Sequence, residues 1–247
     1  ARAFNAEYGG VMRLLATEIN SRSVVPGGTV RVTLYWQVLA PTDEYYSIYM
    51  HVYGLGQQII GQRDSYPGGG LLPTTSLKPG QIFGESYSVP IAQDARGPVA
   101  ARIAVGLYQL EQMRNLPVRD SQGQEVNWPV IGRVRIAAET RPFQASRPLD
   151  ANFGNHVRLT GYDIADDSVR PGDLVSFTVY WNVMRPMNRE YTVFVHLLDD
   201  LGNQWGSGDG PPMADEYPTL FWSEGDWLAD HRELLIKTDV PAGSYRL

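Results

Sequence analysis

Apolar residues occupy every second position in two stretches of the chain. They are Val30, Val32, Leu34, Trp36 and Val38 in the first stretch, and Val175, Phe177, Val179, Trp181 and Val183 in the second. This period of two is typical of β-strands that bury one face. A further strand is predicted after each stretch, at residues 46–52 and 191–197. A Pro-Gly pair at 26–27 and again at 171–172 predicts a turn before the first strand of each set.

The two sets of strands belong to an internal repeat. Residues 8–94 align without a gap with residues 153–239, and 24 of the 87 aligned positions are identical. Chance matching at average composition would give about 5 identities. The identities include Tyr35-Trp36 with Tyr180-Trp181. The repeat predicts two domains whose strands superpose at a constant offset of 145 residues.

The rest of the chain also favours strands. They are predicted at residues 11–19, 58–62, 82–89, 99–108 and 130–137. Short strands separated by Gly and Pro turns predict an all-β fold of two tandem antiparallel β-sandwiches, immunoglobulin-like or fibronectin-III-like. The predicted domains are residues 1–138 and 149–247. Residues 139–148, which contain Pro142 and Pro148, are the predicted linker.

Composition and charge narrow the function classes. The net charge of −6 disfavours a nucleic-acid partner, because such partners need a surface that neutralises phosphates. Cysteine is absent, which excludes disulfides, thiolate metal sites and cysteine nucleophiles. The longest uncharged run, residues 45–62, contains His51 and three glycines, so strand and loop explain it better than a membrane span. The chain begins at Ala1 rather than Met, and we expect it to be an excerpt or a processed product.

The predicted strands and turns carry a set of characteristic residue runs. They are residues 30–38, residues 46–52, Asp64, Pro67, Pro73-Thr74, Gly80, residues 105–108 and residues 116–118. Together these runs resemble an uncharacterised bacterial β-sandwich module. Modules that look like this occur in tandem, often at the C-terminal end of multi-pass membrane glycosyltransferases of the dolichyl-phosphate-mannose type.

The resemblance covers most of the chain and carries several implications. It implies an extracytoplasmic accessory domain, immunoglobulin-like or fibronectin-like, in a parent protein that is anchored in a membrane. The module has no known active site, so the resemblance assigns no catalytic residue. The sequence departs from the module at Leu77, where Trp is expected, and at Leu15-Ala16, where Gly-Tyr is expected.

One titratable pair recurs at equal spacing in both copies. His51 and Asp64 correspond to His196 and Asp209. Such a pair could serve acid–base chemistry or hold a metal ion. Metal sites usually take three or four protein ligands, however, and no nucleophile stands on a sharp turn motif. We therefore favour a His hydrogen-bonded to a turn Asp, and predict no metal, no cofactor and no catalytic residue.

Aromatic residues cluster in the second copy, where they could stack on a ligand such as a sugar ring. They are Trp205, Tyr217, Phe221, Trp222 and Trp227. The three tryptophans align with the apolar residues Ile60, Leu77 and Ile82 of the first copy, which indicates packing. Tyr217 and Phe221 align with Leu72 and Ser76. These two aromatic residues are therefore the candidate binding residues.

Two other features are interpreted as structural. Trp36 and Trp181 lie on the apolar face of a strand and are expected in the core. Residues 199–203 have the acidic start of a calcium loop without its closing Glu, so a hairpin turn is predicted there.

The sequence favours a non-catalytic, extracytoplasmic accessory or binding module. Its partner would be a glycan or another protein domain, and carbohydrate binding is one such role. Two alternatives stay open. One is a carbohydrate-active enzyme that uses carboxylates such as Asp64, Asp209, Glu85 and Asp230. The other is a structural spacer that positions another domain.

The second copy is predicted to be incomplete at its C-terminal side. The first copy continues through the strands predicted at 99–108 and 130–137, and with one residue inserted near Ala242, Leu247 aligns with about Ala101. We therefore expect the second domain to lack these strands and to expose a sheet edge and apolar inner face. A strand shared between copies of the chain, in an oligomer, would cover both.

Overall fold

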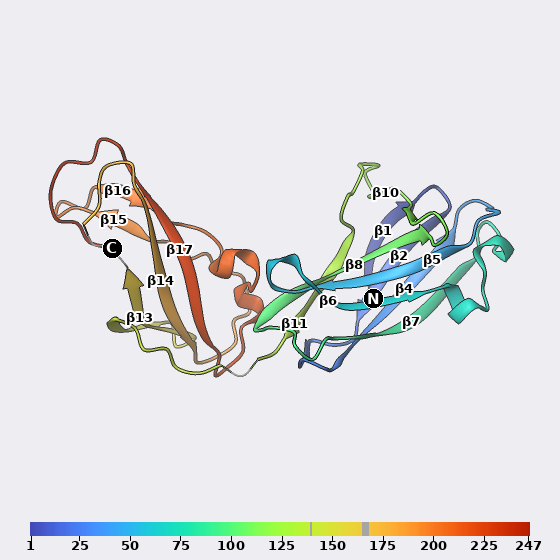
Figure 1. The fold of residues 1–247 in the computed structure, drawn as a ribbon, viewed down its shortest axis with the longest axis horizontal. Coiled ribbons are helices and arrows are strands. Elements are labelled where there is room, and N and C mark those ends of the chain that lie inside the picture. The colour runs from blue at the N-terminus through green and yellow to red at the C-terminus, as the bar shows by residue number, and fades with distance from the viewer. Residues whose placement is uncertain (139, 165–167) are drawn as a thin grey trace. The chain divides into compact units, whose positions relative to one another are not determined.

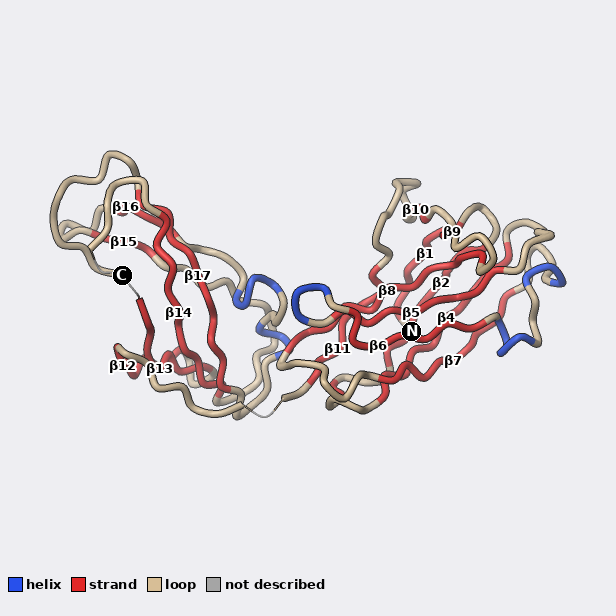
Figure 2. The backbone as a smooth tube through the Cα atoms, viewed as in Figure 1, coloured by secondary structure: helices blue, strands red, loops and turns tan. Residues whose placement is uncertain are grey.

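The computed structural model describes residues 1–138, 140–164 and 168–247, and its regular structure in these ranges is β-strand with five short 3-10 helices. The helical turns lie only in the connections between strands (Figure 2). The prediction of an all-β chain is confirmed. The chain divides into unit 1, Ala1–Ala138, and unit 2, Glu139–Leu247.

Unit 1 contains two sheets that share one core (Figure 1). The first sheet has the order β10 (Val118–Arg119), β1 (Arg2–Tyr8), β2 (Met12–Ile19), β4 (Thr29–Val38) and β7 (Ile82–Pro90). The second has the order β3 (Ser23–Val24), β11 (Val130–Ile136), β8 (Val99–Gln109), β5 (Tyr46–Tyr53) and β6 (Ile59–Ser65), and β9 (Arg114–Asn115) also pairs with β8. Only the β3–β11 pair is parallel among the described strands. Alternate side chains from both sheets fill the core, as their period of two predicts.

Unit 2 contains one antiparallel sheet. Its order is β12 (Arg147–Phe153), β13 (Val157–Ile164), β14 (Leu174–Val183), β17 (Trp227–Ile236), β16 (Gln204–Ser207) and β15 (His196–Leu198). Strand β12 begins at Arg147, so the last two residues of the predicted linker are strand. Glu139, the first residue of that linker, lies outside the described residues.

The internal repeat is confirmed for three strands and two short helices. Adding 145 to the first and last residue numbers of β1, β2 and β4 gives those of β12, β13 and β14. The short helices η2 (Pro67–Gly70) and η3 (Thr74–Ser76) recur in the same way as η4 (Pro212–Asp215) and η5 (Thr219–Phe221). Trp36 lies opposite Leu14 on β2, and Trp181 lies opposite Leu159 on β13. Both tryptophans are buried, so the prediction that they are core residues is confirmed.

The units differ where β5 meets β8. In unit 1, β5 pairs with β6 on one edge and with β8 on the other. The equivalent strand β15 pairs with β16 and, elsewhere in the described residues, only through the bridge between Leu198 and Arg246. That bridge matches the pair Tyr53–Arg102 of unit 1. Arg246 therefore corresponds to Arg102 at an offset of 144, so the predicted insertion near Ala242 is wrong and one residue is missing instead.

Without a second sheet, the inner face of unit 2 is only partly covered. Ile48, Met50 and Val52 point inward from β5 and are 0% exposed. Their equivalents Val193, Val195 and Leu197 are partly exposed. Val179 and Trp181 are each 8% exposed, and Trp181 packs against the rings of Phe153 and Trp222. The predicted exposure of the inner face is thus found at the β15 edge and not at the centre of the sheet.

A carboxylate accepts a hydrogen bond from the same turn in both units, and in unit 2 this carboxylate is buried. In unit 1, Glu85 accepts hydrogen bonds from the Gly68 backbone N–H at 2.7 Å and from the Tyr87 hydroxyl at 2.8 Å. In unit 2, Asp230 accepts from the Met213 N–H at 2.9 Å and from the Arg232 guanidinium at 2.8 Å. Met213 has φ of 53°, a left-handed conformation that costs a residue with a Cβ more than glycine. The carboxylate therefore stabilises a turn that unit 1 makes with glycine.

Arg232 extends this contact across the inner face of unit 2. Its guanidinium also donates to the carbonyl oxygens of Gly208, Gly210 and Val193, at distances from 3.0 to 3.4 Å. The side chains of Arg232 and Asp230 are 5% and 0% exposed. A buried ion pair is tolerated only when its other hydrogen-bonding groups are satisfied, as the donors of Arg232 are here.

We predict that Asp230→Ala destabilises unit 2 by about 3–5 kcal/mol, because it leaves the Arg232 charge buried without its partner. Hydrogen exchange of the β14 and β17 amides would measure this loss in unit 2 specifically. The control is Glu233→Ala on the exposed face of the same strand, which should change stability by less than about 0.5 kcal/mol. Equal protection in the two variants would contradict a stabilising role for the pair.

Candidate functional site

The structure separates the two predicted binding residues. Tyr217 is 0% exposed, and its hydroxyl donates to the Phe221 carbonyl at 2.7 Å and to the Asp226 carboxylate at 2.8 Å. The prediction that Tyr217 binds a ligand is therefore wrong, since its ring packs inside unit 2 and fixes the η5 turn. Phe221 lies in η5 and is partly exposed. It has no aromatic contact among the described residues, so it does not form a site with Tyr217.

The repeated His–Asp pair makes different contacts in the two units. In unit 2 the His196 ring nitrogen lies 3.2 Å from the Asp209 carboxylate, which also accepts from the Val195 N–H at 2.9 Å. In unit 1 the His51 ring instead lies 3.3 Å from the Tyr53 hydroxyl, and Asp64 accepts from the Gln62 amide at 2.7 Å. The unit 2 arrangement is the hydrogen-bonded His–Asp pair expected from the sequence.

Residues 199–203 form the hairpin turn between β15 and β16. Asp199 accepts hydrogen bonds from the backbone N–H groups of Leu201 and Asn203 and from the indole N–H of Trp205. These bonds lower the pKa of Asp199 to about 2, with the Trp205 bond contributing most. The Asp199 carboxylate therefore stabilises the turn through these hydrogen bonds. In the described ranges of the chain, no three His, Asp or Glu side chains lie close enough together to hold a metal ion.

Unit 1 carries a row of aromatic rings that the sequence analysis did not identify. On the outer face of β5, the ring of Tyr49 lies 4.7 Å from His51, and His51 lies 6.0 Å from Tyr53. The row continues from Tyr49 to Tyr108 on β8 at 6.0 Å, and from Tyr53 to Trp128 at 5.1 Å. All five rings are partly exposed. They form the feature that we term the aromatic row: Tyr108, Tyr49, His51, Tyr53 and Trp128.

Small residues on β8 allow the aromatic row to lie against the sheet. Gly106 is opposite Tyr49, and a Cβ built on Gly106 would fall 2.2 Å from the Tyr49 ring. Ala104 is opposite His51 and is 1% exposed, although it points to the outer face. The Tyr49 ring therefore lies over the glycine. A larger residue at position 106 would displace the ring.

Polar groups border the aromatic row on both sides. On β6, Gln62 is opposite His51 and Asp64 is opposite Tyr49. On β8, the Arg102 guanidinium lies 5.6 Å from the centre of the Trp128 ring, a distance typical of a cation–π contact. Ring faces flanked by hydrogen-bonding amide, carboxylate and guanidinium groups form a surface that can bind a polyhydroxylated ring.

Partial burial changes the acidity of the central rings. Burial lowers the pKa of His51, and the nearby Asp64 carboxylate opposes this effect. Burial also raises the pKa of Tyr49, and the neighbouring Tyr53 adds to that increase. At neutral pH the His51 and Tyr49 rings are therefore uncharged and can donate and accept hydrogen bonds.

The period of two in the sequence could have identified the aromatic row. Tyr49, His51 and Tyr53 alternate with the inward residues Met50 and Val52. The residue spacing thus places three rings on one strand face. Their continuation to Tyr108 and Trp128 depends on the β5–β8 register, which the sequence did not reveal. In unit 2 the matching positions hold Phe194 and His196, whose rings are 5.3 Å apart.

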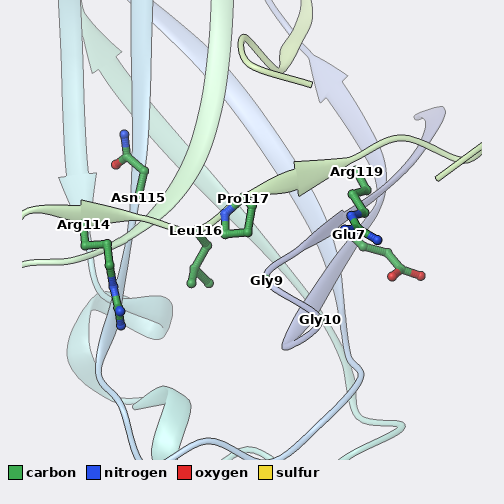
Figure 3. Close-up of a pocket in the computed structure, with 8 residues that line it drawn as sticks. All are labelled: Glu7, Gly9, Gly10, Arg114, Asn115, Leu116, Pro117 and Arg119. Atoms are coloured by element: carbon green, nitrogen blue, oxygen red, sulfur yellow. The ribbon is translucent and has the colours of Figure 1, made fainter. Parts of the chain in front are cut away.

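A separate pocket of about 470 Å³ lies beside the β1–β2 turn of unit 1 (Figure 3). It is lined by Gly9, Gly10, the apolar Leu116 and the charged side chains of Glu7, Arg114 and Arg119. Glu7 is opposite Arg119 in the β1–β10 register and forms an ion pair with Arg13. The Glu7 carboxylate is thus already paired, and we assign no ligand to this pocket.

Comparisons with known proteins do not assign the chain to a family. No family model and no curated protein matches it. One solved structure with a detected similarity is Spo0M, a sporulation control protein from Bacillus subtilis. The similarity covers 85% of this chain and 78% of that chain, at 12% sequence identity and a TM-score of 0.27. At this TM-score the likeness supports no statement about function. No helix in the described residues has the length and apolarity to cross a membrane.

We predict that His51 titrates below its ordinary pKa of 6.5 and that Asp64→Asn lowers its pKa further, because the carboxylate favours the charged ring. Since the folded state binds this proton less tightly than the unfolded state, the contribution of His51 to stability is present above pH 6.5 and is lost as pH falls through the lowered pKa. An NMR titration of the histidine ring protons measures both effects. Asp94→Asn serves as a control elsewhere on unit 1, and an unchanged His51 curve in Asp64→Asn would contradict the assigned interaction.

Proposed function

We propose that the chain is a non-catalytic, extracytoplasmic accessory module that binds a glycan through the aromatic row of unit 1. The observation that carries this proposal is the continuous contact of five partly exposed rings across β5, β8 and Trp128. The ligand is a polysaccharide of pyranose rings. Their C–H faces pack on aromatic faces, and their hydroxyl groups hydrogen-bond to the polar border.

Preorganisation of the rings supports a binding role. Gly106 and Ala104 leave room for Tyr49 and His51 to lie along the sheet, and each ring contacts the next. A surface held in place by its own contacts loses little side-chain freedom on binding, so more of the stacking energy contributes to affinity. Asp64, Gln62 and Arg102 supply acceptors and donors beside the rings, which is where ring hydroxyl groups would lie.

An immunoglobulin-like or fibronectin-III-like classification belongs to the same proposal. Unit 1 has two mainly antiparallel sheets around one core, which is consistent with this class. The extracytoplasmic location and the place beside a membrane glycosyltransferase rest on the resemblance of the strand and turn residues to bacterial β-sandwich modules. Glycan binding would suit a module attached to an enzyme that acts on sugars.

The contacts of the carboxylates favour binding over catalysis. Glu85 and Asp230 are hydrogen-bonded to turn backbone and to their strand neighbours Tyr87 and Arg232. Asp209 is bonded to His196 and to the Val195 N–H. A glycosidase needs two carboxylates placed across one sugar bond, and three of the four candidates hold the fold instead. Release of reducing sugars from a glycan by the wild type, and its loss in Asp209→Asn, would overturn the non-catalytic assignment.

We predict that Tyr49→Ala and Tyr53→Ala each weaken polysaccharide binding at least about tenfold, or about 1.4 kcal/mol, because each removes a stacking face. Affinity electrophoresis in soluble β-glucan, mannan, xylan and pectin would identify the glycan, and calorimetry would measure the affinity. Tyr35→Ala is the matched control. Tyr35 is partly exposed and also lies over a glycine, Gly84, but on the other sheet and away from the aromatic row.

The control separates a binding site from a general effect on folding. Tyr35→Ala should bind like the wild type, while all variants should keep the same melting temperature within about 4–8 °C. Equal affinity in Tyr49→Ala and the wild type would exclude the aromatic row as the site. If the wild type binds none of these glycans, the proposal fails and a spacer that positions another domain becomes the better explanation.

A further inference from the structure

Three arginines lie beside one end of the aromatic row, on the same outer face of unit 1. Arg102 on β8 is opposite Tyr53 on β5, and Arg133 on β11 is opposite Arg102. Arg135 lies two positions after Arg133 and therefore shares its face, whereas Val134 between them is 0% exposed. All three arginines are partly exposed. We term Arg102, Arg133 and Arg135 the arginine patch.

The strand register concentrates positive charge in this patch. Arg102 and Arg133 are direct cross-strand neighbours, an arrangement that brings the Cβ atoms within about 4.5–5.5 Å and is destabilising for like charges. The chain as a whole carries a net charge of −6, so the sign of the patch is opposite to that of the protein. An anionic group held between the two guanidinium groups would offset their repulsion.

The arginine patch meets the aromatic row at Trp128. The Arg102 guanidinium lies 5.6 Å from the centre of the Trp128 ring, which in turn lies 5.1 Å from the Tyr53 ring. A guanidinium group has five N–H donors, and a contact such as that of Arg135 with the Ser23 hydroxyl at 3.1 Å uses only some of them. A ligand ring stacked at this end of the row could therefore place a carboxylate against donors whose planar geometry suits it.

The other end of the aromatic row has the opposite charge. Asp64 is opposite Tyr49, which precedes Tyr53 by four residues on β5. Four residues of a strand span about 13 Å. A ligand carboxylate would be repelled by Asp64 and attracted by the arginine patch, so these charges favour one placement of an acidic ligand along the row.

We propose that the glycan bound by unit 1 is a polysaccharide of uronic acid residues, and that the arginine patch binds one of its carboxylate groups. A sugar ring stacks on Tyr53 and Trp128, and its carboxylate accepts hydrogen bonds from Arg102 and Arg133. This inference rests on the proposed function, because stacking on the aromatic row is what brings the carboxylate to the patch. It adds to that function the charge of the ligand and the end of the row at which the charge is recognised.

The test uses the full chain and two forms of one polymer, polygalacturonate and its methyl ester. Esterification removes the negative charge and keeps the sugar backbone. Calorimetry should show that the wild type binds the acid at least about tenfold more tightly than the ester, because charged hydrogen bonds are lost with the ester. Raising the salt concentration from about 0.05 M to about 0.5 M should weaken binding of the acid much more than binding of the ester.

A variant of the patch shows whether the arginines cause this preference. Arg133→Gln should reduce the ratio of the two affinities at least about fivefold, since it removes a charged donor. The matched control is Arg31→Gln, which removes an exposed arginine of β4 on the other sheet and should keep the wild-type ratio. Both variants should keep the wild-type melting temperature. If Arg133→Gln lowers it, Arg135→Gln takes its place with the same expected result.

The outcomes separate this inference from the proposed function. Equal affinity of the wild type for the two polymers, with both weakened by Tyr49→Ala, would overturn the arginine patch and leave the aromatic row in place. An unchanged ratio in the patch variant would do the same. No binding of either polymer or of any neutral glycan would overturn both proposals. Polyglutamate, which carries carboxylates without sugar rings, should bind at least about tenfold more weakly than polygalacturonate. Equal binding of these two polyanions would overturn the inference, because the patch would then attract any polyanion.

Discussion

The need to cover an apolar sheet face governs both units of this protein. A sheet with alternating side chains has one apolar face, and it is stable only when another layer covers that face. In unit 1 the two sheets cover each other, and the inward residues of β5 are fully buried. In unit 2 the equivalent strand β15 has no strand in the place of β8 among the described residues, its inward residues are partly exposed, and a cavity opens on this face.

The inner face of unit 2 carries an arginine with several hydrogen bonds where unit 1 has a tyrosine. Where unit 1 has Glu85 and Tyr87, unit 2 has Asp230 and Arg232. The longer reach and additional donors of arginine connect β17 to the backbone at Val193, Gly208 and Gly210. The tyrosine hydroxyl can make no comparable set of bonds. The substitution thus fits the more open inner face of unit 2.

The aromatic row on the outer face of unit 1 depends on the neighbour of β5 in the same sheet. Because β8 lies next to β5, its small residues Gly106 and Ala104 fall under the rings of Tyr49 and His51. In unit 2, Phe194 at the position of Tyr49 is 72% exposed, and no strand takes the place of β8 beside it in the described part of the unit. One missing neighbour therefore changes both faces of the strand: the inner face opens into a cavity, and the outer rings lose their support.

The sequence by itself determined the local structure, the repeat and the buried tryptophans. Alternation over 30–38 and 175–183 and the gapless 145-residue offset depend on residues close in the chain, and the strands formed where that pattern predicts them.

The tertiary structure alone decided the site and the alignment of the chain end. Tyr217 is an aromatic residue of the kind that binds ligands, but its side chain is buried and its hydroxyl is hydrogen-bonded to Phe221 and Asp226. Tyr108 and Trp128 join the aromatic row only through the register between strands, and Arg246 corresponds to Arg102 only through its bridge to Leu198. Local periodicity fixes which face of a strand a residue occupies, whereas the identity of its neighbours depends on pairings between residues far apart in sequence.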